Sequence, residues 1–201
     1  MKPKLSAPII VRDKMNFLRE IKKPLIFLGV VFVFSAWLGY YSGQLHPAEA
    51  KGLLDKLSKD LGMLKNINAV AMFLFIFVNN AVKSFAMAAL GSFFGIIPVL
   101  FITVNGLLIG TTSSVVVAHK GLEFLFVGTA PHGILEIPAF LIAGAYGMRL
   151  GRKYYRSLRY GDPFKPLFFR VMREMVRIVL PLLVIASFIE TFITIALLRS
   201  L

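Results

Sequence analysis

Residues 84–118 read SFAMAALGSFFGIIPVLFITVNGLLIGTTSSVVVA and contain no Asp, Glu, Lys or Arg. A helix crosses the hydrocarbon core of a bilayer with about 20 apolar residues, so this stretch is longer than one span needs. The segment Gly91-Ser92-Phe93-Phe94-Gly95 interrupts it, and glycine-rich segments of this kind favour turns. The stretch therefore predicts the end of one membrane-spanning helix, a tight turn, and a second complete span.

A second uncharged stretch covers residues 24–48, and the whole 201-residue chain is 57% hydrophobic and only 16% charged. Soluble domains carry about 25% charged residues. The composition therefore predicts an all-α, polytopic transmembrane helical bundle of about five spans, one of them broken or re-entrant. The chain contains no cysteine, which excludes disulfides, cysteine-bound metals and thiol catalysis.

The membrane domain is expected over residues 24–201. Its predicted spans are 24–43, 67–90, 97–118, 122–148 and 178–198. Leucines at helical spacing predict an amphipathic helix on the outer surface at about residues 50–65. The residues His119-Lys120-Gly121 are expected to close the outer turn between the third and fourth spans.

Two basic segments are expected on the cytoplasmic side. The first is residues 1–23, of which 14–23 are predicted to form a short interfacial helix that ends where Pro24 begins the first span. The second is about residues 149–177, and a long final helix is expected to begin near Pro166 within it. Of the 23 Lys and Arg residues, 16 lie in these two segments.

The net charge of +13 is therefore concentrated at one side of the predicted membrane domain. Short cytoplasmic segments of membrane proteins are enriched in Lys and Arg, and such segments attract anionic lipid heads. The pattern predicts a multi-pass protein of the cell membrane with its N-terminus in the cytoplasm and its C-terminus outside. Its partners are then membrane lipids, including anionic heads, and not nucleic acid.

Glycines recur in pairs at a spacing of four residues. The pairs are Gly39 with Gly43, Gly91 with Gly95, Gly106 with Gly110, and Gly147 with Gly151. Small residues at this spacing let helix backbones approach closely in lipid. Two interpretations remain open: close packing inside one bundle, or a homo-oligomer formed through one of these faces.

Polar and charged residues at membrane depth are the candidate site, because a charge at a helix centre costs about 2.5–3.5 kcal/mol there. They are Asn79, Asn80, Lys83, Asn105, His132, Glu136 and Glu190. Lys83 is expected to pair with Glu136 or Glu190. The set serves either as a structural polar network between helices, as the lining of a path for an ion or polar solute, or as a catalytic site.

The segment Pro131-His132-Gly133 predicts a break within the fourth span, since proline and glycine flank the histidine. His132 and Glu136 are four residues apart, so a helix places them on one face, where they offer two ligands to a divalent metal ion. Zinc sites take three or four ligands, and the alternative is a hydrogen-bonded pair that fixes the bend. No other cofactor is indicated. Hydrolase and phosphate-binding motifs are absent, which favours a non-enzymatic protein.

Taken in order, these features resemble the membrane family named for stage II sporulation protein M. The resemblance covers about residues 20–200 and is carried by Asn79-Asn80, Gly91 with Gly95, Asn105-Gly106 with Gly110, and Pro131-His132-Gly133 with Glu136.

Members of that family are multi-pass membrane proteins without a known catalytic activity, and in spore formers the namesake is a membrane partner of proteins that remodel the cell wall. The resemblance implies a non-enzymatic, oligomeric scaffold for an envelope assembly, with envelope or membrane proteins as partners. The alternative is a channel or transporter for a cation or small polar solute, through a site lined by Asn79, Asn105, His132 and Glu136.

Overall fold

The computed structural model describes residues 9–62 and 68–194, and within these ranges it contains helices and no strand. Five helical stretches are long and apolar enough to cross a membrane, which confirms the predicted all-α bundle with five spans. The elements are α1 (Ile9–Leu45), α2 (Pro47–Gly62), α3 (Ala69–Leu90), α4 (Ile96–Tyr160), α5 (Lys165–Glu174), η1 (Met175–Val179), α6 (Leu180–Phe188) and η2 (Ile189–Thr194).

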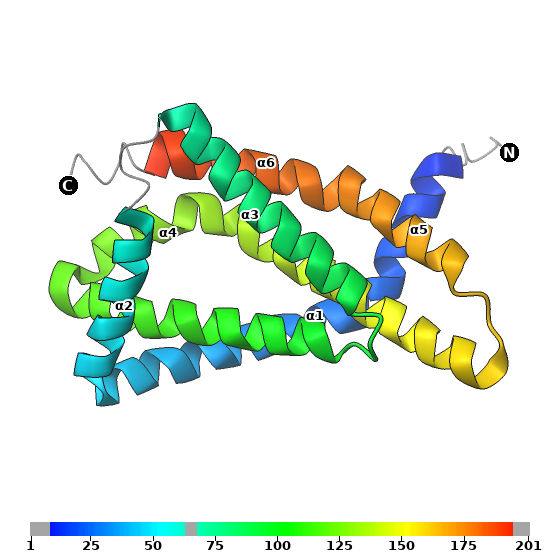
Figure 1. Cartoon of the computed structure of the whole chain (residues 1–201), viewed down its shortest axis with the longest axis horizontal. Coiled ribbons are helices and arrows are strands. Elements are labelled where there is room, and N and C mark those ends of the chain that lie inside the picture. The colour runs from blue at the N-terminus through cyan, green and yellow to red at the C-terminus, as the bar shows by residue number, and fades with distance from the viewer. Residues whose placement is uncertain (1–8, 63–67, 195–201) are drawn as a thin grey trace, which may run out of the picture.

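The helix α4 crosses the bundle twice because the chain reverses at Gly121. This residue has φ 85° and ψ 169°, a combination that glycine adopts without a steric penalty. The returning half runs antiparallel to the outgoing half, since a Cβ on Gly147 would lie 2.8 Å from Cγ of Pro98 near the start of α4. Figure 1 shows the two halves as the sides of a long hairpin.

The break that the sequence predicts at Pro131-His132-Gly133 is not found there. Gly121 is the non-helical position inside α4, and the backbone is helical from residue 122 to Tyr160. Proline removes one backbone hydrogen bond and crowds the preceding turn, which bends a helix without ending it. Figure 1 shows the returning half of α4 as a bent but continuous ribbon.

The prediction of two helices before residue 45 is also wrong. Residues 14–23 and the first span belong to one helix, α1, with Pro24 buried inside it. The missing N–H of proline costs one hydrogen bond and again produces a bend. In Figure 1 the N-terminal third of α1 turns away from the rest of the helix.

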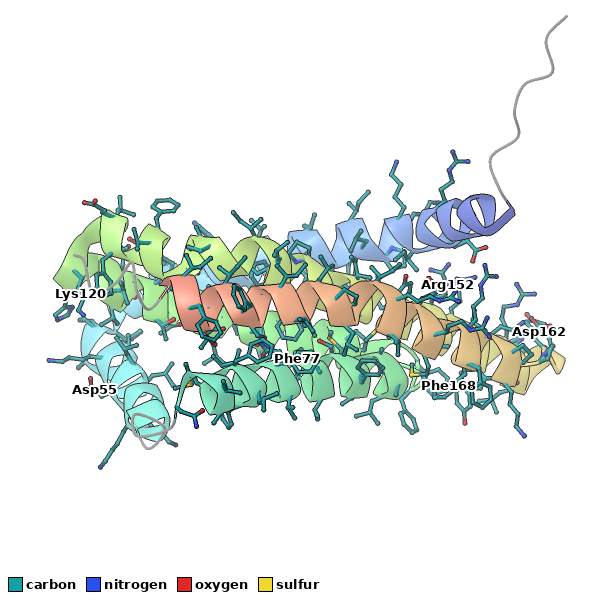
Figure 2. All side chains as sticks on the ribbon, turned by 90° about the horizontal axis from the view of Figure 1, so that it is seen from above. Asp55, Phe77, Lys120, Arg152, Asp162 and Phe168 are labelled. Carbon is teal, nitrogen blue, oxygen red and sulfur yellow. The ribbon has the colours of Figure 1, made fainter. Side chains whose placement is uncertain are left out.

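The two ends of the bundle differ in chemistry. Figure 2 shows Asp55 and Lys120 at one end, and Arg152, Asp162 and Phe168 at the other. The fourth span, which was expected to end at residue 148, continues as α4 to Tyr160 through the first part of the basic segment 149–177, and α5 returns. The end rich in arginine therefore projects as a helical hairpin beyond the end of α3.

The turn of this hairpin is held by one carboxylate. Gly161 ends α4 with φ 72°, and the Asp162 carboxylate accepts a hydrogen bond from Lys153 Nζ at 3.1 Å. Arg156 Nε lies 2.9 Å from the same carboxylate. The hydrogen bond from Lys153, together with the charges of both cations, lowers the pKa of Asp162 below its ordinary 3.8.

The last span is not the regular helix that was expected from Pro166 to Leu198. It consists of α5, η1, α6 and η2, in which η1 and η2 are π-helical; residues 195–198 lie outside the described part. The Leu180 N–H bonds to the Met175 carbonyl, five residues earlier. Each π turn accommodates an extra residue and so rotates the following side chains.

The glycine pairs lie where helix backbones meet within the chain. A Cβ on Gly106 would lie 2.8 Å from Cβ of Ser35 and 2.9 Å from the Phe32 carbonyl oxygen of α1. On α1, Gly39 and Gly43 face the backbone of α4 in return.

A second crossing of the same kind lies at the basic end of the bundle. Gly91 and Gly95 there contact Gly147, Met148 and Gly151. A Cβ on Gly151 would lie 2.6 Å from the Gly91 carbonyl oxygen. These two crossings position α1, α3 and both halves of α4.

Candidate functional site

A cavity of about 320 Å³ lies between the spans. All five contribute to its wall: α1, α3, the outgoing and returning halves of α4, and the η2 end of the last span. Most of the wall is apolar, including Phe32, Phe101 and Phe140. The polar part of the lining is Asn79, Asn80, Asn105, Thr129, Glu136 and Glu190. The structure thus brings together five of the seven residues that the sequence singles out.

The two asparagines of α3 differ in burial. Asn80 is 7% exposed and shares a buried stripe with Ser84, Met87 and Ala88, whereas Asn79 is half-buried. The side chain of Asn80 makes a hydrogen bond to the Glu136 carboxylate of α4. This bond crosses from α3 to the returning half of α4 and therefore positions Glu136 in the cavity.

Asn105 comes from the outgoing half of α4. Its Nδ2 donates a hydrogen bond to the Phe101 carbonyl at 2.7 Å, so the amide oxygen remains as an acceptor for a ligand in the cavity that Asn105 lines. The next residue, Gly106, packs against the backbone of α1. That close contact fixes the position of Asn105 along the axis of α4 and the direction in which its side chain points.

Glu190 reaches the cavity from the last span. It lies in η2, and its carboxylate interacts electrostatically with that of Glu136. Because η1 precedes it, the direction of its side chain differs from that in a regular α-helix, in which successive residues are about 100° apart. Two carboxylates from different spans therefore share one cavity at membrane depth.

Lys83 lies beside the cavity and not in its lining. Its side chain is exposed on α3, and it interacts electrostatically with Glu136. Among the described side chains no ion pair joins Lys83 to Glu136 or Glu190, and the expected pairing of Lys83 with one of these carboxylates stays a prediction. Four methylenes let a lysine ammonium extend toward the membrane surface, and its charge then acts on the cavity from a distance.

The side chain of His132 lies outside the described part of the structure, although its backbone belongs to α4. Its expected interaction with Glu136 therefore stays a prediction. Among the side chains that are described, no group of three or more His, Asp or Glu residues is arranged to hold a metal ion. The divalent metal site that the sequence proposes on His132 and Glu136 also stays a prediction.

Sequence reasoning missed Thr129 in the cavity wall and the buried hydroxyls of the last span. Ser187 and Thr191 are buried there, and Ser84 is buried on α3; the hydroxyl oxygens of all three have no hydrogen-bond partner among the described residues. The available signal was the spacing of Ser187, Thr191 and Thr194, which places small polar groups on one side of an otherwise apolar span.

A family model described as SpoIIM, Stage II sporulation protein M, matches residues 25–195. The match contains every residue of the cavity wall. A search of the curated proteins and a search of the solved structures each gave no match.

Proposed function

The chain belongs to the stage II sporulation protein M family, and from that premise we propose that it is a non-enzymatic membrane protein that binds a cation or small polar solute between its spans and passes it across the bilayer. The observation that carries this proposal is the cavity of about 320 Å³ with the carboxylates of Glu136 and Glu190 in its wall. A bundle held together by packing alone has no need of two carboxylates at this depth, where each is costly.

The chemistry of the wall favours a cation over an anion. The carboxylates of Glu136 and Glu190 and the amide oxygen of Asn105 are acceptors, and Asn105 has already used one amide N–H on Phe101. Hard oxygen acceptors of this kind bind metal cations and ammonium groups. Phe32, Phe101 and Phe140 supply an apolar boundary, in which the attraction between the ligand and the carboxylates is stronger than in water.

A closed layer separates the cavity from the basic end of the bundle. Met87, Ala143 and Leu183 are at most 1% exposed and belong to one apolar core. On α4, Ala143 lies between Glu136 and the crossing at Gly147. Passage toward that end would therefore require these three residues to move.

The orientation follows from charge. We propose that the N-terminus and the hairpin of α4 and α5 lie in the cytoplasm, since most of the 23 Lys and Arg residues lie at that end and positively charged segments remain inside. The same arginines and lysines would contact anionic lipid heads.

Flux measurements on the purified chain in proteoliposomes test the proposal. Wild-type protein is expected to pass cations from a panel of Na⁺, K⁺, Mg²⁺ and Ca²⁺, and Glu136→Gln should reduce that flux by roughly tenfold or more, because it removes one charge from the site. Glu123→Gln is the matched control, since Glu123 is exposed on the same helix near the Gly121 turn and should leave flux unchanged.

A second candidate is the oligomeric scaffold for an envelope or membrane-protein assembly. The feature that favours it is the basic hairpin of α4 and α5, which extends past α3 and offers a surface outside the membrane. The paired glycines do not supply a face for a homo-oligomer, because their contacts are made inside one chain. The flux experiment separates the candidates, since a scaffold gives no flux for wild type or variant.

A further inference from the structure

Two carboxylates and one lysine determine the charge around the cavity. Glu136 and Glu190 line it, and Lys83 is the cation of the described residues that acts on Glu136. With both carboxylates ionised, these three groups carry a net charge of one negative unit. The side chain of His132 is not described, and a neutral imidazole leaves this count unchanged.

A single positive charge would neutralise the site, whereas a divalent ion would leave it positive. Charge that remains uncompensated at membrane depth is costly, so the count discriminates between cations by their valence. Ca²⁺ takes six to eight oxygen ligands and prefers several carboxylates.

Buried hydroxyls on the two spans that carry Asn80 and Glu190 are a second observation, although they are not among the residues that line the cavity. Thr191 directly follows Glu190 and is 7% exposed, and Ser187 lies one turn earlier with 0% exposed. On α3, Ser84 is also 0% exposed and lies one turn after Asn80. These hydroxyl oxygens have no partner among the described residues. Polar atoms buried in this way are normally satisfied, and water molecules that accompany an ion would satisfy them. The hydroxyl that lines the cavity itself is that of Thr129.

We propose that the cavity binds one monovalent cation, held by the carboxylates of Glu136 and Glu190 and by amide and hydroxyl oxygens around them, with Lys83 setting the valence. This assignment rests on the proposed function and names its ligand class. Removing the Lys83 charge leaves two negative units and should shift the preference of the site toward divalent cations.

Equilibrium binding to the purified full chain tests the assignment, with ²²Na⁺ and ⁴⁵Ca²⁺ as probes and K⁺ and methylammonium as competitors. Wild-type protein should bind ²²Na⁺, release it to K⁺ or methylammonium, and keep it in the presence of Ca²⁺ at the same concentration. The competitor that displaces ²²Na⁺ at the lower concentration identifies the ligand as an alkali-metal ion or an organic ammonium.

Three variants vary the net charge. Glu190→Gln makes the site neutral and should weaken ²²Na⁺ binding by roughly tenfold or more. Lys83→Gln should raise the ratio of ⁴⁵Ca²⁺ to ²²Na⁺ affinity by a similar factor. The double variant, which combines Glu190→Gln with Lys83→Gln, has the same net charge as the wild type, one negative unit. It should again prefer monovalent cations. Lys120→Gln is the control, since Lys120 is an exposed lysine at the opposite end of the bundle from the arginine-rich hairpin.

Preferential binding of ⁴⁵Ca²⁺ by the wild type would overturn the valence assignment and leave the proposed cation function standing. An unchanged calcium-to-sodium ratio in Lys83→Gln would overturn the role of Lys83. If wild-type protein with a normal melting curve binds none of these cations, both this inference and the proposed function fail. The wild-type competition decides the valence even if a variant does not fold.

Discussion

Asn105 illustrates how much of the site is determined by single side chains. Its amide N–H is held by the Phe101 carbonyl at 2.7 Å, so the group is oriented before a ligand is present. Its neighbour Gly106 allows the backbone of α1 to approach. When the acceptors of a site are already oriented, less free energy is spent on ordering them as the ligand binds. Asn105 is oriented in advance by its own helix.

The glycine crossings can be tested one residue at a time. In Gly110→Ala the new methyl group would collide with the Ala36 carbonyl oxygen of α1 and would lie 2.7 Å from the Tyr40 amide nitrogen. Backbone atoms cannot rotate away, so we expect a destabilisation of about 1–3 kcal/mol, typical of overpacking. The measurement is the thermal unfolding midpoint of the purified protein in detergent.

The matched control is Gly29→Ala, because a Cβ at Gly29 of α1 has no heavy atom within 4 Å. Alanine favours helix over glycine by roughly 0.5–1 kcal/mol, so this variant should be unchanged or slightly more stable. Equal melting points for both variants would contradict the close approach of α1 and α4 at Gly110.

At the scale of elements, the last span departs most from regular geometry. The two π segments, η1 and η2, enclose the nine residues of α6, and Pro181 in the first turn of α6 has no N–H to donate. π segments are found frequently at functional sites. Here they affect which side of the span carries Glu190, because each π turn rotates the residues that follow it.

The hairpin of α4 and α5 should loosen at low pH. Because the pKa of Asp162 is lowered in the folded protein, its ionised form stabilises the turn. That contribution is fully present above the ordinary pKa of 3.8 and is lost as the pH falls through the lower folded value. Amide hydrogen exchange around Gly161 should therefore accelerate, relative to the rest of the chain, only as the pH falls below about 4.

Asp162→Asn should remove this pH dependence and show the faster exchange already at neutral pH, since the amide carries no charge to hold Lys153 and Arg156. Asp55→Asn, on the exposed side of α2, is the control and should behave as wild type. If amide exchange around Gly161 at pH 7 is equally fast in Asp162→Asn and in the wild type, the ion pairs of Asp162 with Lys153 and Arg156 do not hold the turn.

At the scale of the whole molecule, five spans form a bundle with an asymmetric distribution of charge. The end with Arg152 and Asp162 lies opposite the end with Asp55 and Lys120 (Figure 2). Between them, the cavity is lined by all five spans, and Met87, Ala143 and Leu183 are buried in one apolar core. If all five candidate spans cross the membrane, Ile9 and Thr194 lie on opposite sides of it.

Reporter fusions test this arrangement. A reporter inserted at Gly161, in the exposed turn between α4 and α5, should be found in the cytoplasm, and one inserted at Lys120, beside the Gly121 turn, should be found outside. A reporter fused after Leu201 should also be outside. The physical reason is the retention of Lys and Arg on the cytoplasmic side. If the Gly161 and Lys120 reporters lie on the same side, the five-span topology is wrong.

The sequence by itself determined the class of the protein and most of its membrane spans, because hydrocarbon leaves a chain few options. An uncharged stretch such as residues 84–118 must form helices that satisfy their own backbone, and glycines mark where they turn. It also identified Asn105, Glu136 and Glu190, since a polar group at membrane depth is conspicuous by composition alone.

Only the tertiary structure decided which of these residues share a cavity and how they interact. Pro24 and Pro131 look like helix ends in the sequence, yet the helices continue because packing against neighbouring spans outweighs one missing hydrogen bond. The direction of Glu190 depends on the π turns, and the separation of Lys83 from the carboxylates depends on the rotation of α3. These features arise from contacts between spans, and the spacing of residues along one helix does not contain them.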